Sequence, residues 1–164
     1  MRKIVFLSII VLGAAFIIIA CNRSGEIPQT AATLYFADAE MNRLLPYDDE
    51  LPLTDAEHMA KAAISKLIEG RDNNEKIRRL LPKDKRSVSV RVDEDIAYVD
   101  LKSGITKDLP SSRDIERLLI YQIVDTLTEI KGIRFVRFTI DGNVHKSLMG
   151  YFDMRETYKY QYPE

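Results

Sequence analysis

A helix that leads directly into a strand is predicted over residues 115–144, and this unit constrains the fold more than any other stretch. Its first half repeats apolar residues at spacings of three and four, which is typical of an amphipathic helix: Leu119, Ile120, Ile123, Leu127 and Ile130. Gly132 follows, where a helix end favours a residue that can adopt positive φ. The period then changes to two, so Val136, Phe138 and Ile140 share one face of a strand. Asp141-Gly142 predicts a tight turn and a short returning strand.

The elements before this unit are marked by shorter patterns. Residues 33–36 form a β-rich run, and residues 37–53 are expected to be a long loop with a short extended piece around Leu44-Leu45. Thr54 and Glu57 have the spacing of a capping box, which opens a helix that ends at Gly70. Alternation over 88–92 and 97–101 predicts a hairpin that turns at 93–95. Ser111 or Ser112 is expected to cap the later helix.

This order of strand, helix, hairpin, helix and strand predicts an α+β fold. We expect a two-layer sandwich of β-α-β-β-α-β order, with both helices packed on one face of a small sheet. The other face should be partly polar, because Arg91 and Arg137 alternate with the apolar strand residues.

Composition excludes several classes of protein. With 46% hydrophobic and 30% charged residues, the chain is neither disordered nor a multi-span membrane protein. The 24 basic and 25 acidic residues nearly balance, which argues against a nucleic-acid partner. The seven glycines form no phosphate-binding loop, and the single cysteine excludes an intramolecular disulfide.

The N-terminal residues are typical of a bacterial lipoprotein signal. Arg2 and Lys3 precede an apolar run over 4–20, and Ile18-Ile19-Ala20-Cys21 resembles a lipobox. The resemblance implies cleavage before Cys21 and acylation, for example with palmitate, so that residues 1–20 are a signal peptide. An uncleaved signal anchor is the alternative, because such a run can just span a bilayer. Either way the rest of the chain is expected on the extracytoplasmic side of a membrane, facing outward or toward a periplasm.

The mature chain divides into three parts. Residues 21–31 are polar and contain Gly and Pro, which predicts a flexible tether. Residues 32–150 form the expected domain, and residues 151–164 form an aromatic tail. Tyr158, Tyr160 and Tyr162 alternate with polar residues in that tail, so it could add as a strand to a partner or pack on its own domain.

Six short segments resemble the GerMN domain, which is named for a sporulation and germination lipoprotein of endospore formers. They are, in chain order, residues 33–36, 67–70, 81–82, 97–101, 121–127 and 140–142. The resemblance implies a small α+β module similar to ring-building motifs, outside the cytoplasm, with a role in protein interaction. It supplies no catalytic residues. This chain has one copy of the module where the namesake has two, so a role in the general cell envelope is as open as one in sporulation or germination.

No constellation of catalytic or metal-ligating residues stands out. His58 and His145 lack a third zinc ligand at a recognisable spacing, and no nucleophile elbow is present. The sequence therefore predicts no enzyme activity, no cofactor and no metal site. We expect a lipid-anchored scaffolding or assembly protein that binds other envelope proteins or its own copies. Its candidate interface residues are Arg91, Arg137, Tyr158, Tyr160 and Tyr162. An envelope protein that binds a small molecule or glycan is the alternative, and a hydrolase accessory is a third.

Overall fold

The computed structural model of the protein describes residues 27–71 and 74–161, which contain two helices and six strands. The expected signal peptide over residues 1–20, Cys21 and Tyr162 lie outside the described residues. The elements are β1 (Gln29–Asp38), β2 (Leu44–Pro52), α2 (Ala56–Glu69), β3 (Ile77–Arg78), β4 (Val88–Asp93), β5 (Ile96–Leu101), α3 (Arg113–Thr128) and β6 (Phe135–Ile140).

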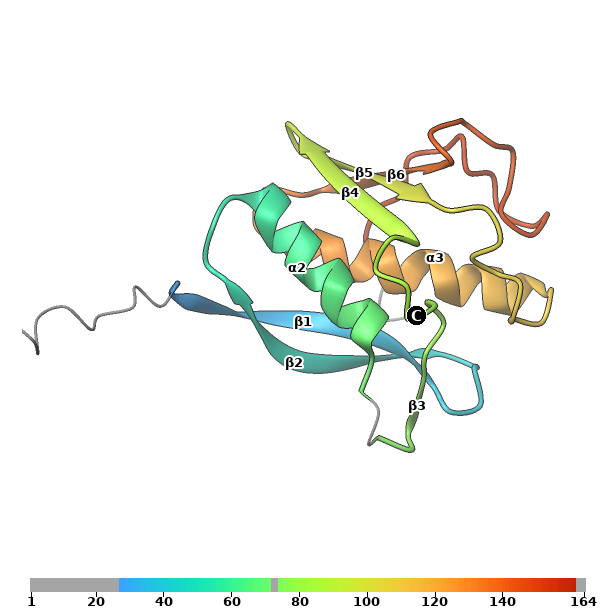
Figure 1. Ribbon diagram of the computed structural model, residues 1–164, viewed down its shortest axis with the longest axis horizontal. Coiled ribbons are helices and arrows are strands. Elements are labelled where there is room, and N and C mark those ends of the chain that lie inside the picture. The colour runs from blue at the N-terminus through green and yellow to red at the C-terminus, as the bar shows by residue number, and fades with distance from the viewer. Residues whose placement is uncertain (1–26, 72–73, 162–164) are drawn as a thin grey trace, which may run out of the picture.

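The two helices lie between two small sheets (Figure 1). Strands β4, β5 and β6 form one sheet in that order, with β4 and β5 antiparallel and β5 and β6 parallel. Strands β2, β1 and β3 form the other. The predicted α+β class is confirmed, and both helices cover one face of the β4–β5–β6 sheet. The structure adds a second sheet on the opposite side of the helices, which the expected two-layer order did not include.

Strand β2 corrects the expected loop over residues 37–53. It pairs with β1 in an antiparallel ladder that runs from Gln29 opposite Pro52 to Ala37 opposite Leu44. The N–H of Asp38 donates to the carbonyl of Arg43, so by alternation Pro46 and Pro52 direct their nitrogens away from β1, to the side where the edge strand has no neighbour. Its acidic residue Asp49 accepts hydrogen bonds from Lys66 Nζ on α2 at 2.7 Å and from Arg71, two residues after the helix, at 3.0 Å. These two cations neutralise a charge that looked typical of a loop.

The helix ends are close to the predicted positions. Asp55, and not Thr54, is the N-cap of α2, because its carboxylate accepts the N–H of His58 at 3.0 Å. Gly70 ends the helix at a φ of 69°, as its position predicted. Ser112 caps α3 by accepting the N–H of Ile115 at 3.2 Å. The turn after β6 leads into a loop, so His145 lies outside any strand and only an isolated bridge joins Ile140 to Asn143.

Helix α3 is buried around most of its circumference because it packs on both sheets. Beside its apolar stripe it therefore buries four polar side chains: Glu116, Gln122, Asp125 and Thr126. Thr126 Oγ1 accepts the backbone N–H of Tyr35 on β1 at 3.0 Å, which joins α3 to the second sheet.

Gln122 differs from the other three because both of its amide atoms are buried without a hydrogen-bond partner among the described residues. Replacing it with methionine keeps the shape of the side chain and removes these two unpaired groups. We expect Gln122→Met to raise the free energy of unfolding by about 1 to 2 kcal/mol. Urea denaturation measures the change, and a loss of stability would show that the amide has a partner.

Candidate protein-interaction surface

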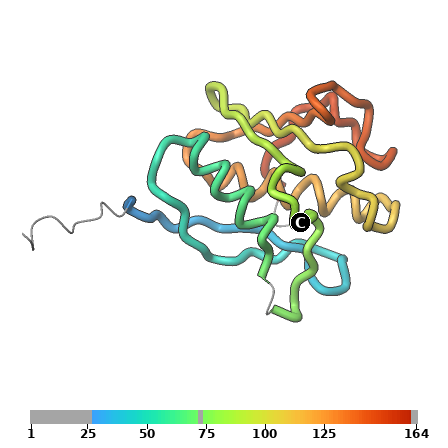
Figure 2. The backbone as a smooth tube through the Cα atoms, in the orientation of Figure 1, coloured from blue at the N-terminus to red at the C-terminus, as the bar shows by residue number. Residues whose placement is uncertain are grey.

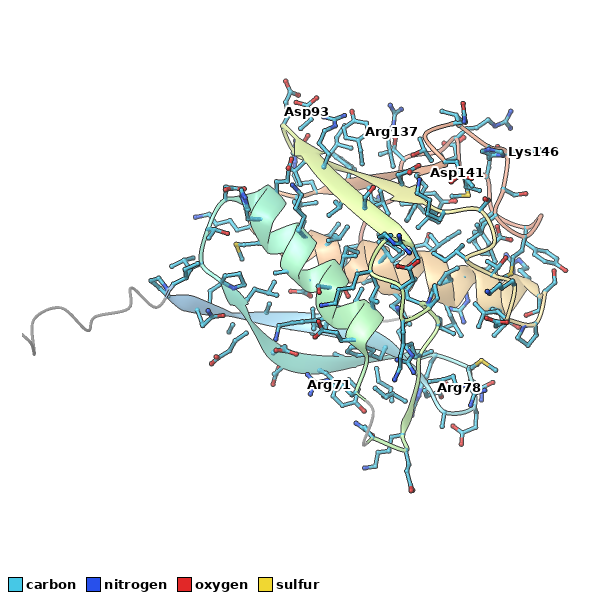
Figure 3. The ribbon with its side chains drawn as sticks, in the orientation of Figure 1. Arg71, Arg78, Asp93, Arg137, Asp141 and Lys146 are labelled. Atoms are coloured by element: carbon cyan, nitrogen blue, oxygen red, sulfur yellow. The ribbon has the colours of Figure 1, made fainter. Side chains whose placement is uncertain are left out.

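The face of the β4–β5–β6 sheet that points away from the helices carries polar and aromatic side chains. Strand register sets Arg91 opposite Tyr98 and Tyr98 opposite Arg137, so these three residues form one row across all three strands. Figure 3 shows Arg137 projecting away from the helix pair and Asp93 at the tip of the β4–β5 hairpin. We call this row the Arg–Tyr–Arg row.

The Arg–Tyr–Arg row presents two cations with an aromatic ring between them. The Arg91 guanidinium lies 4.5 Å from the centre of the Tyr98 ring, which is the geometry of a cation–π contact. Its side chain is 59% exposed and makes an ion pair with Asp93 at 3.4 Å. Arg137 donates from Nε to the hydroxyl of Thr157 at 2.9 Å and is also exposed. The row is therefore basic, accessible and held in shape by its neighbours.

A second row lies beside it and is acidic at its centre. Asp100 stands between Ser89 and Thr139 in the strand register. Burial raises the pKa of Asp100, but the N–H of Gly142, the hydroxyl of Thr139 and the ammonium of Lys102 outweigh it and hold the pKa below its usual value. The outer face thus carries a fixed negative charge next to the Arg–Tyr–Arg row.

The aromatic tail packs on its own domain, so Tyr158 is corrected as an interface residue. The backbones of Tyr158 and Val136 exchange two hydrogen bonds of 2.9 Å, which covers the outer edge of β6, and Tyr158 is only 7% exposed. Figure 2 shows the C-terminal segment folded over the same end of the molecule as β6. Tyr160 is 41% exposed, and its hydroxyl lies 2.8 Å from that of Tyr35.

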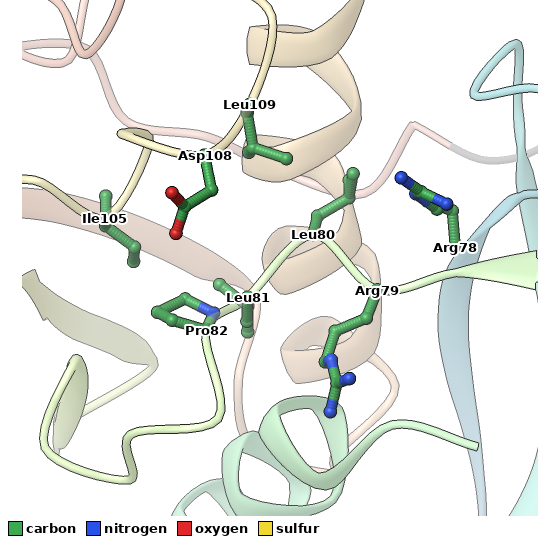
Figure 4. Close-up of a pocket in the computed structure, with 8 residues that line it drawn as sticks. All are labelled: Arg78, Arg79, Leu80, Leu81, Pro82, Ile105, Asp108 and Leu109. Carbon is green, nitrogen blue, oxygen red and sulfur yellow. The ribbon is translucent and has the colours of Figure 1, made fainter. Parts of the chain in front are cut away.

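A pocket of about 340 Å³ lies between the segment after β3 and the loop after β5 (Figure 4). Leu80, Leu81, Pro82 and Ile105 give it apolar walls, and Arg78, Arg79 and Asp108 supply its charges. None of the residues that line it is aromatic. Its volume is at the lower end of the range for small-molecule sites.

A family model described as "Germane: Sporulation and spore germination" matches residues 33–146. The chain belongs to the Germane family. The match covers nearly the whole of the expected domain and includes all three residues of the Arg–Tyr–Arg row. Among curated proteins, none matches the chain.

Three solved structures share the fold of this Germane protein. A provisionally named lipoprotein from Clostridium perfringens aligns at 24% identity and a TM-score of 0.56, over 81% of this chain and 89% of the other. The tandem GerMN domains of the sporulation protein GerM from Bacillus subtilis align at 21% identity and a TM-score of 0.58, over 77% of this chain and 44% of that one. The first GerMN domain of that protein alone aligns at 22% identity and a TM-score of 0.53, over 76% of this chain and 92% of the domain.

Among the described residues, no three His, Cys, Asp or Glu side chains gather in a way that could hold a metal ion. No helix in that part of the chain has the length and apolar character needed to cross a membrane. Strand β1 begins at Gln29, so residues 29–31 of the expected tether belong to the fold.

Sequence reasoning placed Arg91 and Arg137 on one face and the structure brings them into one row. It missed Tyr98, which joins them. Tyr98 alternates with Ala97 and Val99 in β5, and this alternation was a usable signal because the strand buries Ala97 and Val99 on the helix side.

Proposed function

We propose that this Germane protein is lipid-anchored, lies outside the cytoplasm and binds other proteins of the cell envelope through the outer face of its β4–β5–β6 sheet. The family description points to sporulation and spore germination as the process. The N-terminal sequence, with its lipobox-like Cys21, supports the anchor, and the Clostridium perfringens relative described as a lipoprotein is consistent with it.

The Arg–Tyr–Arg row is the observation that carries the proposal. Tyr and Arg are enriched in the residues that contribute most to binding at protein interfaces. The row is built on three strands and not on a loop, so its side chains are held in place before a partner arrives. Because the guanidinium groups lie on an exposed face, an acidic or hydrogen-bond-accepting surface of a partner could reach both of them.

We expect partner capture in living cells to depend on this row. A photo-crosslinking amino acid in place of Tyr98 should capture a small, reproducible set of envelope proteins. The double variant Arg91→Glu and Arg137→Glu should lower their yield by about tenfold or more. Mass spectrometry of the crosslinked products measures the yield.

The matched control is the double variant Lys107→Glu and Lys131→Glu, which makes the same change in charge at exposed positions outside the row. It should leave the yield unchanged. Circular dichroism checks that both double variants stay folded. An equal loss in the control, or full capture by the Arg91 and Arg137 variant, would contradict the proposal.

The pocket in Figure 4 favours a second candidate function, the binding of a small ligand. Its two arginines and apolar walls suit a small anionic molecule better than a glycan. Two results together would favour this candidate. The crosslinker at position 98 would capture no protein, and a small molecule would co-purify with the wild-type chain but not with Arg78→Ala.

A further inference from the structure

The last part of the chain that the structure describes crosses from one sheet to the other. The backbones of Tyr158 and Val136 exchange two hydrogen bonds of 2.9 Å, which attach the segment to β6. Two residues later, the hydroxyl of Tyr160 lies 2.8 Å from that of Tyr35 on β1. We call residues 157–161 the strap, because they join the two sheets across one side of α3.

Asp125 on α3 lies beneath the strap. Its Oδ1 accepts the backbone N–H of Gln161 at 3.0 Å, and the residue is 1% exposed. On the same helix, Glu129 follows one turn later and accepts the hydroxyl of Tyr35 at 2.9 Å. Lys159, the cation of the strap, is exposed, and no described Lys or Arg makes an ion pair with Asp125. The other titratable groups on this side are the hydroxyls of Tyr121, Tyr158 and Tyr160. The closed strap therefore covers a carboxyl whose polar neighbours are one backbone N–H and a second carboxyl.

The same side of α3 holds a second polar group that the closed strap leaves unsatisfied. On the helical wheel, Gln122 lies between Asp125 and Thr126, one turn before them. Thr126 contacts β1 and Asp125 contacts the strap, so this side of the helix is where the strap meets the second sheet. Both amide atoms of Gln122 are buried without a hydrogen-bond partner among the described residues. Water stabilises an unpaired amide and a buried carboxylate alike, so both groups favour opening of the fold at this side.

We propose that the strap is a lid controlled by the charge of Asp125: it closes firmly when Asp125 is protonated and opens more often when Asp125 is ionised. The strap is attached by a few separate hydrogen bonds. The loop over 148–151 that precedes it is held by three bonds to the buried carboxylate of Glu116. This difference lets the strap open while the rest of the chain stays folded.

The direction of the pH dependence follows from the burial of Asp125. In the closed form, burial raises the pKa of its carboxyl from 3.8 to about 6. In the open form the carboxyl faces water, and its pKa returns toward 3.8. Between these two values the closed form binds more protons than the open form. Closing is therefore strongest in acid and weakens as the pH rises to about 6.

The start of the strap touches the Arg–Tyr–Arg row. Thr157 Oγ1 accepts an N–H from Arg137 Nε at 2.9 Å. Opening of the strap removes this bond and leaves Arg137 free to turn away from Tyr98, which weakens a partner contact that needs both arginines. This consequence rests on the proposed function, whereas the movement of the strap does not.

Hydrogen exchange of the full-length chain in detergent measures the opening. The backbone amides of Tyr158 and Gln161 both donate hydrogen bonds in the closed strap, so they exchange when it opens. After correction for the intrinsic rate at each pH, they should exchange about tenfold faster at pH 7.5 than at pH 5. The matched control is the amide of Met154, which donates to the carbonyl of Lys146 at 2.9 Å before the strap begins. It should change only as global stability changes.

Two variants separate the charge of Asp125 from the contacts of the strap. Asp125→Asn keeps the oxygen that accepts the Gln161 N–H and removes the charge, so exchange of the strap amides should no longer depend on pH. Tyr160→Phe removes the hydrogen bond to Tyr35. It should speed exchange of the strap amides about fivefold at both pH values and keep the tenfold difference between them.

Crosslinking from position 98 tests the link to the row. Capture by the wild-type chain, relative to capture by Asp125→Asn, should be lower at pH 7.5 than at pH 5. If the strap amides respond to pH and this ratio does not, the lid is supported and its link to the row is overturned. If neither chain captures a protein, the proposed function fails, and the exchange rates still decide whether the strap is a lid.

Three exchange results would overturn the lid itself. They are equal rates of the strap amides at the two pH values in wild type, a tenfold difference that persists in Asp125→Asn, and a change at Met154 as large as that at Gln161. The last result would mean that the strap opens only when the whole domain unfolds.

Discussion

Replacing Glu116 with alanine is expected to lower the free energy of unfolding by about 3 to 5 kcal/mol. The Glu116 carboxylate is fully buried in the first turn of α3. Its Oε1 accepts the N–H groups of Leu148 and Met149, each at 3.0 Å, and its Oε2 accepts the N–H of Tyr151 at 2.8 Å. The alanine variant leaves these three donors unpaired and opens a cavity, and both effects destabilise the folded chain.

Urea denaturation measures this loss, and hydrogen exchange shows where it arises. The amides of residues 148, 149 and 151 should exchange faster in Glu116→Ala, while those of β5 should change only as global stability changes. Glu116→Gln should lie between wild type and alanine, because its carbonyl oxygen can still accept two N–H groups while its amide nitrogen faces a donor.

The matched control is Asp114→Ala, in the same helical turn. Its side chain is 74% exposed, and its Oδ1 lies 4.0 Å from Nε of Arg117. An exposed pair of this kind contributes less than about 1 kcal/mol. If the Glu116 and Asp114 variants lose the same stability, the carboxylate of Glu116 does not hold the 148–151 loop in the way that we describe.

Elements with one strongly apolar side were predictable from the sequence. Helix α3, helix α2 and the β4–β5 hairpin each bury a stripe whose period shows directly in the residues. Strand β2 was not predictable in this way, because Pro46 and the acids around Asp49 are unusual in strands. What makes them acceptable is an edge position and two cations, Lys66 and Arg71, that come from later in the chain.

Buried polar residues show the same limit. Glu116 continues the apolar stripe of α3 one turn before Leu119 and Ile120, which is a signal that it is buried. Its partners, however, are backbone groups 32 to 35 residues away, and no local pattern predicts them. Arg91 and Arg137 could be assigned to one face from alternation alone. Their exact pairing through Tyr98 required the parallel register of β5 and β6.

For the C-terminal tail, the sequence pattern left two arrangements open. Alternating tyrosines are consistent both with a partner-binding strand and with a strand on the chain's own domain. The choice depends on whether β6 has an unpaired edge within reach. It does, and Tyr158 fills it, with its ring edge-on to Phe138 at 5.5 Å between centres and to Tyr121 at 5.9 Å. Tyr158 is therefore buried on the chain's own domain, whereas Arg91 and Arg137 on the sheet face stay exposed.

Replacing Asp125 with asparagine is expected to stabilise the chain at neutral pH by about 2 to 3 kcal/mol. Asp125 is 1% exposed on α3. Burial raises the pKa of its carboxyl from 3.8 to about 6; the N–H of Gln161, which donates to Oδ1 at 3.0 Å, lowers that pKa, and the charge of Glu129 raises it further. Asparagine keeps the oxygen that accepts the Gln161 N–H and removes the buried charge.

The sign of the pH dependence follows from these values. Between pH 3.8 and about 6 the folded chain binds more protons at Asp125 than the unfolded chain does, so its contribution to the free energy of unfolding falls as pH rises through this window. Above about pH 6 the penalty is complete and constant. The advantage of Asp125→Asn should therefore be full at pH 7 and nearly absent at pH 4.

Urea denaturation of wild type and Asp125→Asn across this range measures the difference. Asp153→Asn is a control of opposite sign, because the guanidinium and backbone N–H of Arg155 lower the pKa of Asp153 to about 2. That variant should be the less stable one at neutral pH and should converge with wild type only in strong acid. If the free energies of unfolding of Asp125→Asn and wild type differ by the same amount at all pH values, Asp125 titrates normally. Its burial beside the C-terminal segment then carries no electrostatic penalty.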